Sequence, residues 1–361
     1  MGSRDRHLHR QRCCTRQSRH ETGTIALTTS TSPSIPAARG RPAADGPLAV
    51  EAAGIAFANP ILLAAGTAGY GRELAGVVSL AKLGGIVTKA VSVAPRAGAP
   101  SPRVAEFAGG MINAIGLANP GLESVRSEQL PWLLEHLASA STRVIVNVVG
   151  STVEDFAAVV AGLEESAIRA GTSRSAADAY ELNVSCPNVR AGGMEFGADP
   201  ATLRAVVAGA RAVTSRPLFV KLSPTLADIA GAASTAVDAG ADGLTLVNTV
   251  PGLVIDVEQR RPALGFGTGG VSGAAILPVG VLATWKVSRA LPGVPIIGVG
   301  GVTSATDALQ YILAGATLVA IGTAAMREPR LPERIVADLE RWCERRRVTV
   351  RQLVGTLEWP A

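Results

Sequence analysis

Eight short apolar runs, separated by alanine-rich stretches, restrict most strongly what this chain can fold into. The runs are rich in β-branched residues and nearly continuous in apolar character, which is typical of parallel strands buried on both faces. Strands that alternate with helical stretches predict repeated βα units. The runs are ILLAA (61–65), GIVTKAV (85–91), VIVNVVG (144–150), AYELNVSC (179–186), PLFVKLS (217–223), GLTLVNT (243–249), PIIGVGG (295–301) and LVAIGTA (318–324).

Eight strands, each followed by a helix, close a TIM (β/α)8 barrel, and residues 46–361 suffice for one such catalytic domain. A doubly wound sheet rarely needs eight evenly patterned parallel strands. The segment LAVEAAGIAFANP (48–60) predicts a hairpin that caps the bottom of the barrel. Two long connections, 92–130 and 250–280, follow the second and sixth strands and predict inserted active-site loops that cover the substrate.

Residues 1–45 differ from the rest of the chain in composition. They are rich in Arg, Ser, Thr and Pro and lack an apolar period, which predicts a disordered tail. A transit peptide and an upstream start codon are the alternative interpretations. The tail holds eight Arg and three acidic residues, whereas residues 46–361 hold 26 basic and 26 acidic side chains. The tail alone therefore accounts for the net charge of +5, and nucleic-acid binding loses its main support.

The four cysteines are Cys13, Cys14, Cys186 and Cys343, and they form no C-x-x-C pair or Cys/His cluster with metal-ligand spacing. We therefore expect no metal site and a reducing, cytoplasmic location. No apolar run approaches the roughly 18 residues of a membrane span, so no membrane association is expected.

Two lysines lie within apolar runs. The chain has only four Lys against 30 Arg, and Lys89 and Lys221 fall in the second and fifth runs. Lys is rarely buried without a partner, so an ion pair with a carboxylate is one interpretation. The other is a ligand, because an ammonium suits an electron-rich flavin ring or a substrate carboxylate.

Polar residues and glycines also gather at the carboxyl ends of the runs, the rim where barrels bind ligands. Gly300-Gly301 and Gly322-Thr323 follow the seventh and eighth runs. They either mark tight turns or bind a phosphate through backbone N–H groups, and FMN fits a phosphate site near two lysines. Cys186, in the context NVSCPN, is either a buried apolar thiol or a catalytic residue, and its place at a strand end favours catalysis.

Several short motifs of the chain, taken together, resemble those of one known family. The motifs VTKAV, GGMINAIGLANPG, ELNVSCPN, VKLSP, LVNT, GTGGVSG, IIGVGGV and AIGT together resemble the class 1 dihydroorotate dehydrogenases, in order from about residue 59 to 322. The stretch SCPNVRAGGMEFGADP is most similar to the class 1B, NAD-linked catalytic subunit. Class 2 membrane enzymes place Ser at the position of Cys186 and carry an N-terminal helical pair, which the polar tail does not resemble.

The resemblance implies the oxidation of (S)-dihydroorotate to orotate in pyrimidine (UMP) biosynthesis. Cys186 would remove the proton from C5 while hydride passes from C6 to N5 of FMN, which requires a thiol pKa tuned toward neutrality. The implied substrate-binding residues are Lys89, Asn113, Ala114, Ile115, Gly116, Leu117, Asn183, Asn248 and Thr249. The implied FMN-binding residues are Ala65, Gly66, Lys89, Ala90, Asn147, Asn183, Lys221, Val247, Gly273, Gly300, Gly301, Gly322 and Thr323.

The sequence departs from the family in two places. Ala65 stands where the family often has Ser, so one flavin hydrogen bond would come from the backbone alone. Ala274 and Leu277 replace Pro and Lys of the usual SGPAIKP, which changes the surroundings expected for the flavin phosphate. Neither departure removes a catalytic group.

The resemblance also implies a partner subunit with FAD and an iron–sulfur cluster that passes electrons to NAD. It implies a dimer of catalytic chains, either as a homodimer or, with the partner subunits, as a heterotetramer. This chain has neither a dinucleotide fingerprint nor a cluster-ligating cysteine set. Two rival hypotheses remain: an FMN barrel of the dihydropyrimidine dehydrogenase type, and a catalytically silent flavin-binding subunit. The loop Asn113–Leu117, suited to a substrate carboxylate, and the presence of Cys186, Lys89 and Lys221 argue against them.

Overall fold

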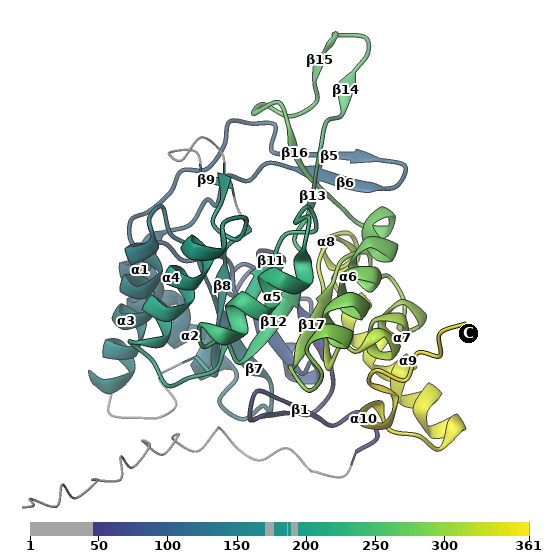
Figure 1. Ribbon diagram of the computed structural model, residues 1–361. Coiled ribbons are helices and arrows are strands. Elements are labelled where there is room, and N and C mark those ends of the chain that lie inside the picture. Colours follow the sequence, from purple (N-terminus) through teal and green to yellow (C-terminus); the bar gives the residue numbers. More distant parts are fainter. Residues whose placement is uncertain (1–45, 170–176, 186, 189–193, 361) are drawn as a thin grey trace, which may run out of the picture. The chain divides into compact units, whose positions relative to one another are not determined.

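The computed structural model describes residues 46–169, 177–185, 187–188 and 194–360. The predicted tail (1–45) and Cys186 lie outside the described residues. Eight parallel strands close into a barrel, which confirms the predicted TIM fold (Figure 1). In chain order these strands are β3 (Ile61–Leu63), β4 (Gly85–Val87), β7 (Arg143–Val148), β8 (Ala179–Asn183), β11 (Leu218–Leu222), β12 (Gly243–Leu246), β17 (Ile296–Val299) and β18 (Leu318–Ile321).

Each predicted run coincides with one of these strands, although β7 begins one residue before its run, and most strands end before the predicted polar residues. β4 ends at Val87, so the expectation that Lys89 lies inside an apolar strand is wrong. The regular pairing with β7 is interrupted at this point: the Lys89 N–H donates to the carbonyl of Gly69, in the loop after β3, at 2.7 Å, and pairing with β7 resumes at Val91. Lys89 is consequently half-buried on the rim of the barrel, whereas Lys221 lies within β11 as predicted.

Helices surround the barrel, with α3 beside α4, α4 beside α5, α5 beside α6, and α6 beside α7. One βα unit departs from the prediction of a helix after every strand, because β3 is followed by the 3₁₀ turn η1 (Leu80–Lys82). The remaining helical segments are α1 (Gly121–Ser124), η2 (Val125–Gln129, a π-turn), α2 (Leu130–His136), α3 (Val153–Arg169), α4 (Pro200–Arg211), α5 (Ile229–Asp238), η5 (Ala274–Ile276), α6 (Leu277–Ala290), α7 (Ala305–Ala314), α8 (Thr323–Arg327), α9 (Leu331–Arg346) and α10 (Val350–Leu353).

Side-chain caps begin three of the barrel helices. The side chains of Asp199, Asp228 and Ser304 accept hydrogen bonds from backbone N–H groups in the first turns of α4, α5 and α7. Such caps satisfy donors that a helix cannot pair internally. They define where each helix starts after its strand, and so help to set the length of the loops on the rim.

The N-terminal hairpin was also predicted correctly. β1 (Val50–Ala52) and β2 (Ile55–Phe57) pair antiparallel. Arg143, at the start of β7, is buried and donates from Nε to the carbonyl of Ala56 at 2.8 Å. Its guanidinium also lies 3.6 Å from a carboxylate oxygen of the buried Asp178. Arg143 therefore ties the hairpin to the amino-terminal end of the barrel.

The two long connections fold into strands rather than open loops. β5 (Val104–Phe107) and β6 (Gly110–Asn113) come from the first, and β13 (Val250–Gly252) and β16 (Gly269–Ser272) come from the second. They form one antiparallel sheet in the order β13-β16-β6-β5, and the hairpin of β14 (Ile255–Asp256) and β15 (Arg261–Pro262) projects beyond it (Figure 1). Pairing between segments so far apart in the sequence could not be inferred from either segment alone.

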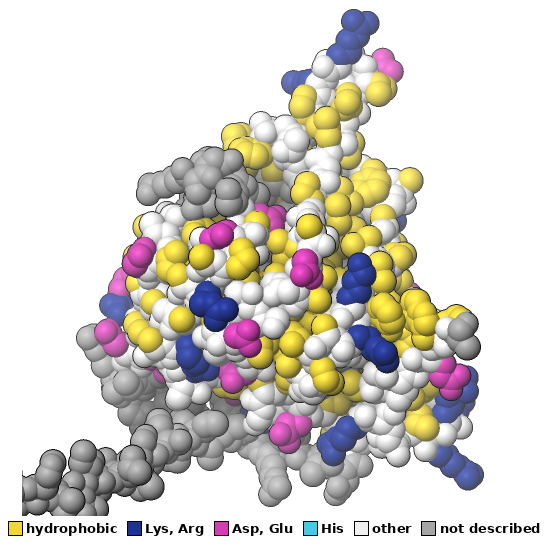
Figure 2. Space-filling view, viewed as in Figure 1, with side chains coloured by type: hydrophobic (Ala, Val, Ile, Leu, Met, Phe, Trp, Pro, Cys, Tyr) yellow, Lys and Arg dark blue, Asp and Glu magenta, His cyan; other side chains and the backbone are white. Residues whose placement is uncertain are grey.

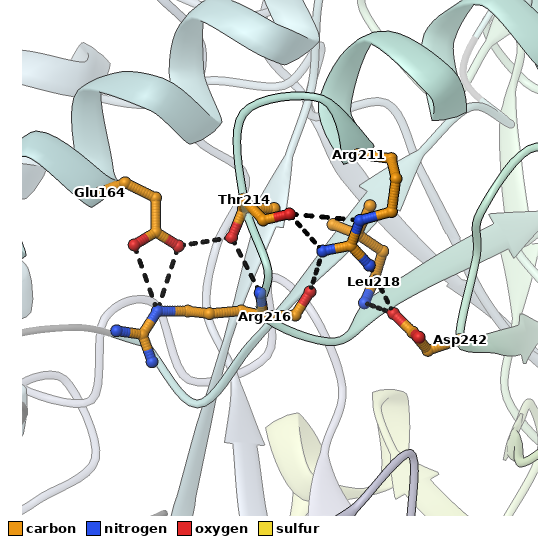
Figure 3. A network of polar contacts seen from close by, with 6 residues as sticks. All are labelled: Glu164, Arg211, Thr214, Arg216, Leu218 and Asp242. Carbon is orange, nitrogen blue, oxygen red and sulfur yellow. Dashed lines mark hydrogen bonds and ion pairs between the residues drawn. The ribbon is translucent and has the colours of Figure 1, made fainter. Parts of the chain in front are cut away.

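A polar network supports the amino-terminal side of β11 (Figure 3). Glu164 of α3 accepts a hydrogen bond from the Thr214 hydroxyl at 2.6 Å and lies 3.1 Å from Nε of Arg216. Arg211 bonds the carbonyls of Thr214 and Arg216 and pairs with Asp242, whose carboxylate also accepts the Leu218 N–H. The network fixes the loop between α4 and β11, and therefore where the strand carrying Lys221 begins.

The surface mixes charges of both signs. Figure 2 shows Lys and Arg side chains interspersed with Asp and Glu on the face in view, in keeping with the balanced charge of residues 46–361. Exposed apolar residues near the projecting hairpin are Leu253, Ile255, Val257 and Phe266. None of the helices in the described part of the chain combines the length and apolar character needed to cross a bilayer.

Candidate active site

The orientation of β8 determines which polar side chains enter the barrel. Tyr180 points outward, because its hydroxyl donates to Glu164 of α3 at 3.1 Å. Successive side chains of a strand alternate between its two faces, so Glu181 and Asn183 point into the barrel. Burial and the adjacent carboxylate of Glu164 raise the pKa of the Tyr180 phenol well above its ordinary value.

Glu181 is a buried carboxylate inside the barrel, 1% exposed. It accepts a hydrogen bond from the Asn147 side-chain amide at 2.6 Å and another from the Thr245 hydroxyl at 2.7 Å. The amide oxygen of Asn147 is also buried and has no hydrogen-bond partner among the described residues. Buried polar atoms are almost always paired, so an unpaired acceptor is unusual. This oxygen is available to accept a hydrogen bond from a ligand.

Lys221 of β11 adds a positively charged side chain beside these polar residues. It is 7% exposed and lies in register with Asn183 on one side and Thr245 on the other. Within the described residues neither Lys221 nor Lys89 forms an ion pair or a side-chain hydrogen bond. The described residues therefore provide no carboxylate partner for either lysine, in contrast to the ion-pair interpretation.

A cluster of hydrogen-bonded side chains follows β8 and β12. The amide of Asn248 donates to Oγ of Ser185 at 2.6 Å and to Oδ1 of Asn183 at 3.4 Å, while Ser185 donates to Asn183 at 2.9 Å. The backbone N–H of Thr249 donates to Asn248 at 2.8 Å. The structure thus brings together three of the predicted substrate-binding residues. The predicted base, Cys186, lies outside the described residues but follows Ser185 directly in the chain.

The loop predicted to hold a carboxylate, Asn113–Leu117, starts at the end of β6. Asn113 lies opposite Gly270 of β16, and its amide donates to the Gly270 carbonyl at 3.3 Å. Gly270 also lies against Thr249, because a Cβ on this glycine would come 2.0 Å from the threonine hydroxyl. The inserted sheet therefore joins the predicted loop to the Asn248–Thr249 side of the site.

The predicted phosphate-binding residues also lie near one another. Thr323 donates its hydroxyl hydrogen to Ser272 at 2.8 Å, and Ser272 directly precedes Gly273. Gly301 has a positive φ of 76°, and a Cβ there would lie 2.6 Å from Leu277 at the start of α6. Only a residue without a side chain allows the backbone to approach so closely in this conformation. A Cβ on Gly322 would lie 3.7 Å from Ala64, which links this cluster to the predicted residues Ala65 and Gly66.

Ala90 and Val247 complete the predicted set. Both are buried, and the carbonyl of Ala90 accepts a hydrogen bond from the Tyr70 hydroxyl at 3.0 Å. The Val247 N–H donates to the carbonyl of Val299 in β17 at 3.0 Å. These backbone contacts fix the segments that follow β4 and β12.

Sequence reasoning missed several polar residues of this region. Glu181 and Thr245 lie two residues before Asn183 and Val247, and the two-residue period of a strand was the signal that could have found them. Asn119 is buried and bonds the side chain of Ser92, the carbonyl of Leu117 and the N–H of Gly121. It holds the loop that contains Leu117, which only the tertiary contacts reveal.

The raised pKa of Glu195 predicts that the stability of the protein depends on pH. Burial raises the pKa of its carboxyl, and the hydrogen bond from Ser223, 3.1 Å long, partly opposes that shift. A raised native pKa means that the native state binds the proton more tightly than the unfolded chain. Stability therefore falls as pH rises from the ordinary glutamate pKa through the raised native pKa. Glu195→Gln should therefore raise Tm at pH 7.5, by roughly 1–3 °C. The gain should vanish near pH 4, about the ordinary glutamate pKa.

Thermal unfolding of both proteins between pH 4 and 8 checks this prediction. Ser223→Ala, which removes the bond to the same carboxylate, should have the opposite effect at pH 7.5. A lower Tm for Glu195→Gln at pH 7.5 would contradict the assigned cause.

The closed barrel, with polar side chains gathered at the carboxyl ends of its strands and the buried Lys221 on β11, has the architecture of (β/α)8-barrel enzymes. The sequence profile of the dihydroorotate dehydrogenase family matches residues 47–342. The chain belongs to this family. A relative from Pelobacter propionicus, named dihydroorotate dehydrogenase B (NAD(+)), catalytic subunit, is 48% identical over 86% of this chain and 98% of its own length. Relatives with the same name from Geotalea daltonii and Geobacter metallireducens are each 44% identical over the same shares.

Proposed function

We propose that this chain is the FMN-dependent catalytic subunit of a dihydroorotate dehydrogenase, which oxidises (S)-dihydroorotate to orotate in pyrimidine biosynthesis. The observation that carries the proposal is that two polar groups of barrel side chains have no partner among the described residues. Among the described residues, the buried Lys221 has no ion-pair partner and the Asn147 oxygen accepts no hydrogen bond. Lys221 lies in register with Asn183, and Asn147 lies opposite Glu181, two residues before Asn183 on the same strand. Family membership and the names of the relatives support the same substrate.

The residues present fit a flavin mononucleotide. The isoalloxazine ring offers an imide N–H for the Asn147 oxygen and electron-rich atoms for the Lys221 ammonium. The glycines around Gly301 fit a phosphate. FMN, when bound, supplies the acceptor for the two electrons of the oxidation. The remaining proposed contacts come from the rim residues Ala65, Gly66, Lys89, Ala90, Asn183, Val247, Gly273, Gly300, Gly322 and Thr323.

The chain's own residues would bind the substrate and remove its proton. The amides of Asn113, Asn183 and Asn248 offer both donors and acceptors, which suits a ring that carries N–H, C=O and carboxylate groups. The Cys186 thiolate would accept the proton from C5 as the C6–H bond gives up its hydride. Desolvation and a nearby positive charge are the physical means of tuning such a thiol.

The electrons would leave through another subunit. The relatives are named as catalytic subunits of an NAD(+)-linked enzyme, which supports a partner for this chain as well. The four cysteines lack the spacing of cluster ligands, so we assign FAD and the iron–sulfur cluster to that partner. A cytoplasmic heterotetramer built on a dimer of catalytic chains is the proposed assembly.

Anaerobic reduction by alternative substrates tests the proposal. The purified protein is expected to carry FMN and to lose its 450 nm absorbance within seconds of mixing with dihydroorotate, but not with dihydrouracil. Bleaching by dihydrouracil alone would favour a dihydropyrimidine dehydrogenase. Yellow protein that neither compound bleaches would favour a silent flavin-binding subunit.

A further inference from the structure

Glu181 places its carboxylate inside the barrel, and the proposed reaction does not use this group directly. It lies two residues before Asn183 on β8 and directly opposite Asn147 of β7 in the strand register. Both of its oxygens accept hydrogen bonds, one from Asn147 at 2.6 Å and one from Thr245 at 2.7 Å. The carboxylate therefore connects β7 with β12 across the interior of the barrel.

The chemistry of this contact determines how the Asn147 amide is oriented. An amide has an oxygen that only accepts and a nitrogen that only donates, and in isolation its two orientations differ little. Both carboxylate oxygens of Glu181 act as acceptors, so the NH2 group of Asn147 faces Glu181. The Asn147 oxygen must then face the other way, where it is buried and has no partner among the described residues.

We infer that Glu181 is a positioning residue, which orients Asn147 so that its amide oxygen accepts a hydrogen bond from the imide N–H of the flavin ring. The inference rests on the proposed function, because the flavin is the donor that the Asn147 oxygen would bond. A reversed amide would present a donor to that N–H instead. The cofactor would then lose one hydrogen bond and face an unfavourable contact between two donors.

An isosteric exchange of polarity tests this inference. In Asn147→Asp two carboxylates face each other, and FMN should bind at least about tenfold more weakly. In the double variant Asn147→Asp/Glu181→Gln, the introduced glutamine amide donates to the introduced aspartate and accepts from Thr245, so every polar atom of the contact is again paired. The second oxygen of the aspartate then presents an acceptor to the ring, and affinity should return to within about threefold of the parent protein.

Single variants provide the matched controls. In Glu181→Gln the side-chain oxygen can still accept from Asn147 while its NH2 group faces Thr245, whose hydroxyl can accept, so FMN affinity should change by less than about threefold. Glu181→Met has a similar volume but no strong acceptor, and should weaken FMN binding by about the same factor as Asn147→Ala. Adding Glu181→Met to Asn147→Ala should then weaken it little further, because Glu181 acts through Asn147.

The measurements are FMN dissociation constants from flavin fluorescence, the absorption spectrum of the bound flavin, and Tm of each protein without FMN. The isosteric pair keeps the inference testable if Glu181→Met does not fold. A double variant that binds FMN no better than Asn147→Asp alone, or additive losses for Glu181→Met and Asn147→Ala, would overturn it. Failure of the parent protein to bind FMN would instead overturn the proposed function.

Discussion

Replacing Cys186 with alanine is expected to leave FMN bound and to lower the turnover of dihydroorotate by about 10²- to 10⁴-fold. The expectation follows from the role that the NVSCPN motif assigns to this thiol, which would remove the C5 proton in the proposed reaction. FMN content is measured from the ratio of 450 to 280 nm absorbance, and the chemical step from the rate of anaerobic bleaching.

Two cysteine variants serve as controls. Cys186→Ser should retain little activity near neutral pH, because a hydroxyl is a much weaker acid than a thiol. Cys343→Ala should keep normal turnover, because Cys343 is buried in α9, where burial raises the pKa of its thiol. Normal turnover of Cys186→Ala would remove Cys186 as the proposed base.

Replacing Arg143 with methionine is expected to reduce the free energy of unfolding by about 3–5 kcal/mol. The guanidinium is 1% exposed, bonds the carbonyl of Ala56 and lies 3.6 Å from the carboxylate of Asp178, itself only 6% exposed. Methionine fills a similar volume but leaves Asp178 as a buried charge without this cation. It also releases the N-terminal hairpin from the base of the barrel.

Urea unfolding followed by circular dichroism measures this loss. The matched control is Arg341→Met, because Arg341 pairs with Asp338 on the exposed face of α9 and an exposed pair contributes little. Equal midpoints for Arg143→Met and Arg341→Met would show that the buried pair at the base of the barrel does not stabilise the fold.

The strands were predictable because the physical reason for their pattern is local. A parallel strand buried on both faces must be apolar nearly throughout, and this is visible in every run from Ile61 to Ile321. Their ends were less accurate, since the position where a strand leaves the barrel depends on which backbone group pairs with which. Lys89 illustrates the error, because its N–H bonds Gly69 rather than a neighbouring barrel strand.

The gathering of polar residues on one rim was predictable, but the contacts between them were not. The carboxyl ends of parallel strands meet on one rim, so Asn147, Asn183, Lys221 and Asn248 could be grouped from the sequence. Glu181 was overlooked because a carboxylate within an apolar strand shows no partner until the neighbouring strands are in register. Asn119 was overlooked because its partners include backbone groups of a loop whose course no local pattern predicts.

The sequence by itself determined the barrel and the set of residues on its rim, because apolar periodicity and strand order are properties of the chain taken segment by segment. Only the tertiary structure decided how two distant insertions pair into one sheet and which polar groups satisfy one another. The partners of a buried polar atom are chosen by register across strands, so the Asn147 oxygen, unpartnered among the described residues, became visible only once Glu181 was in place beside it.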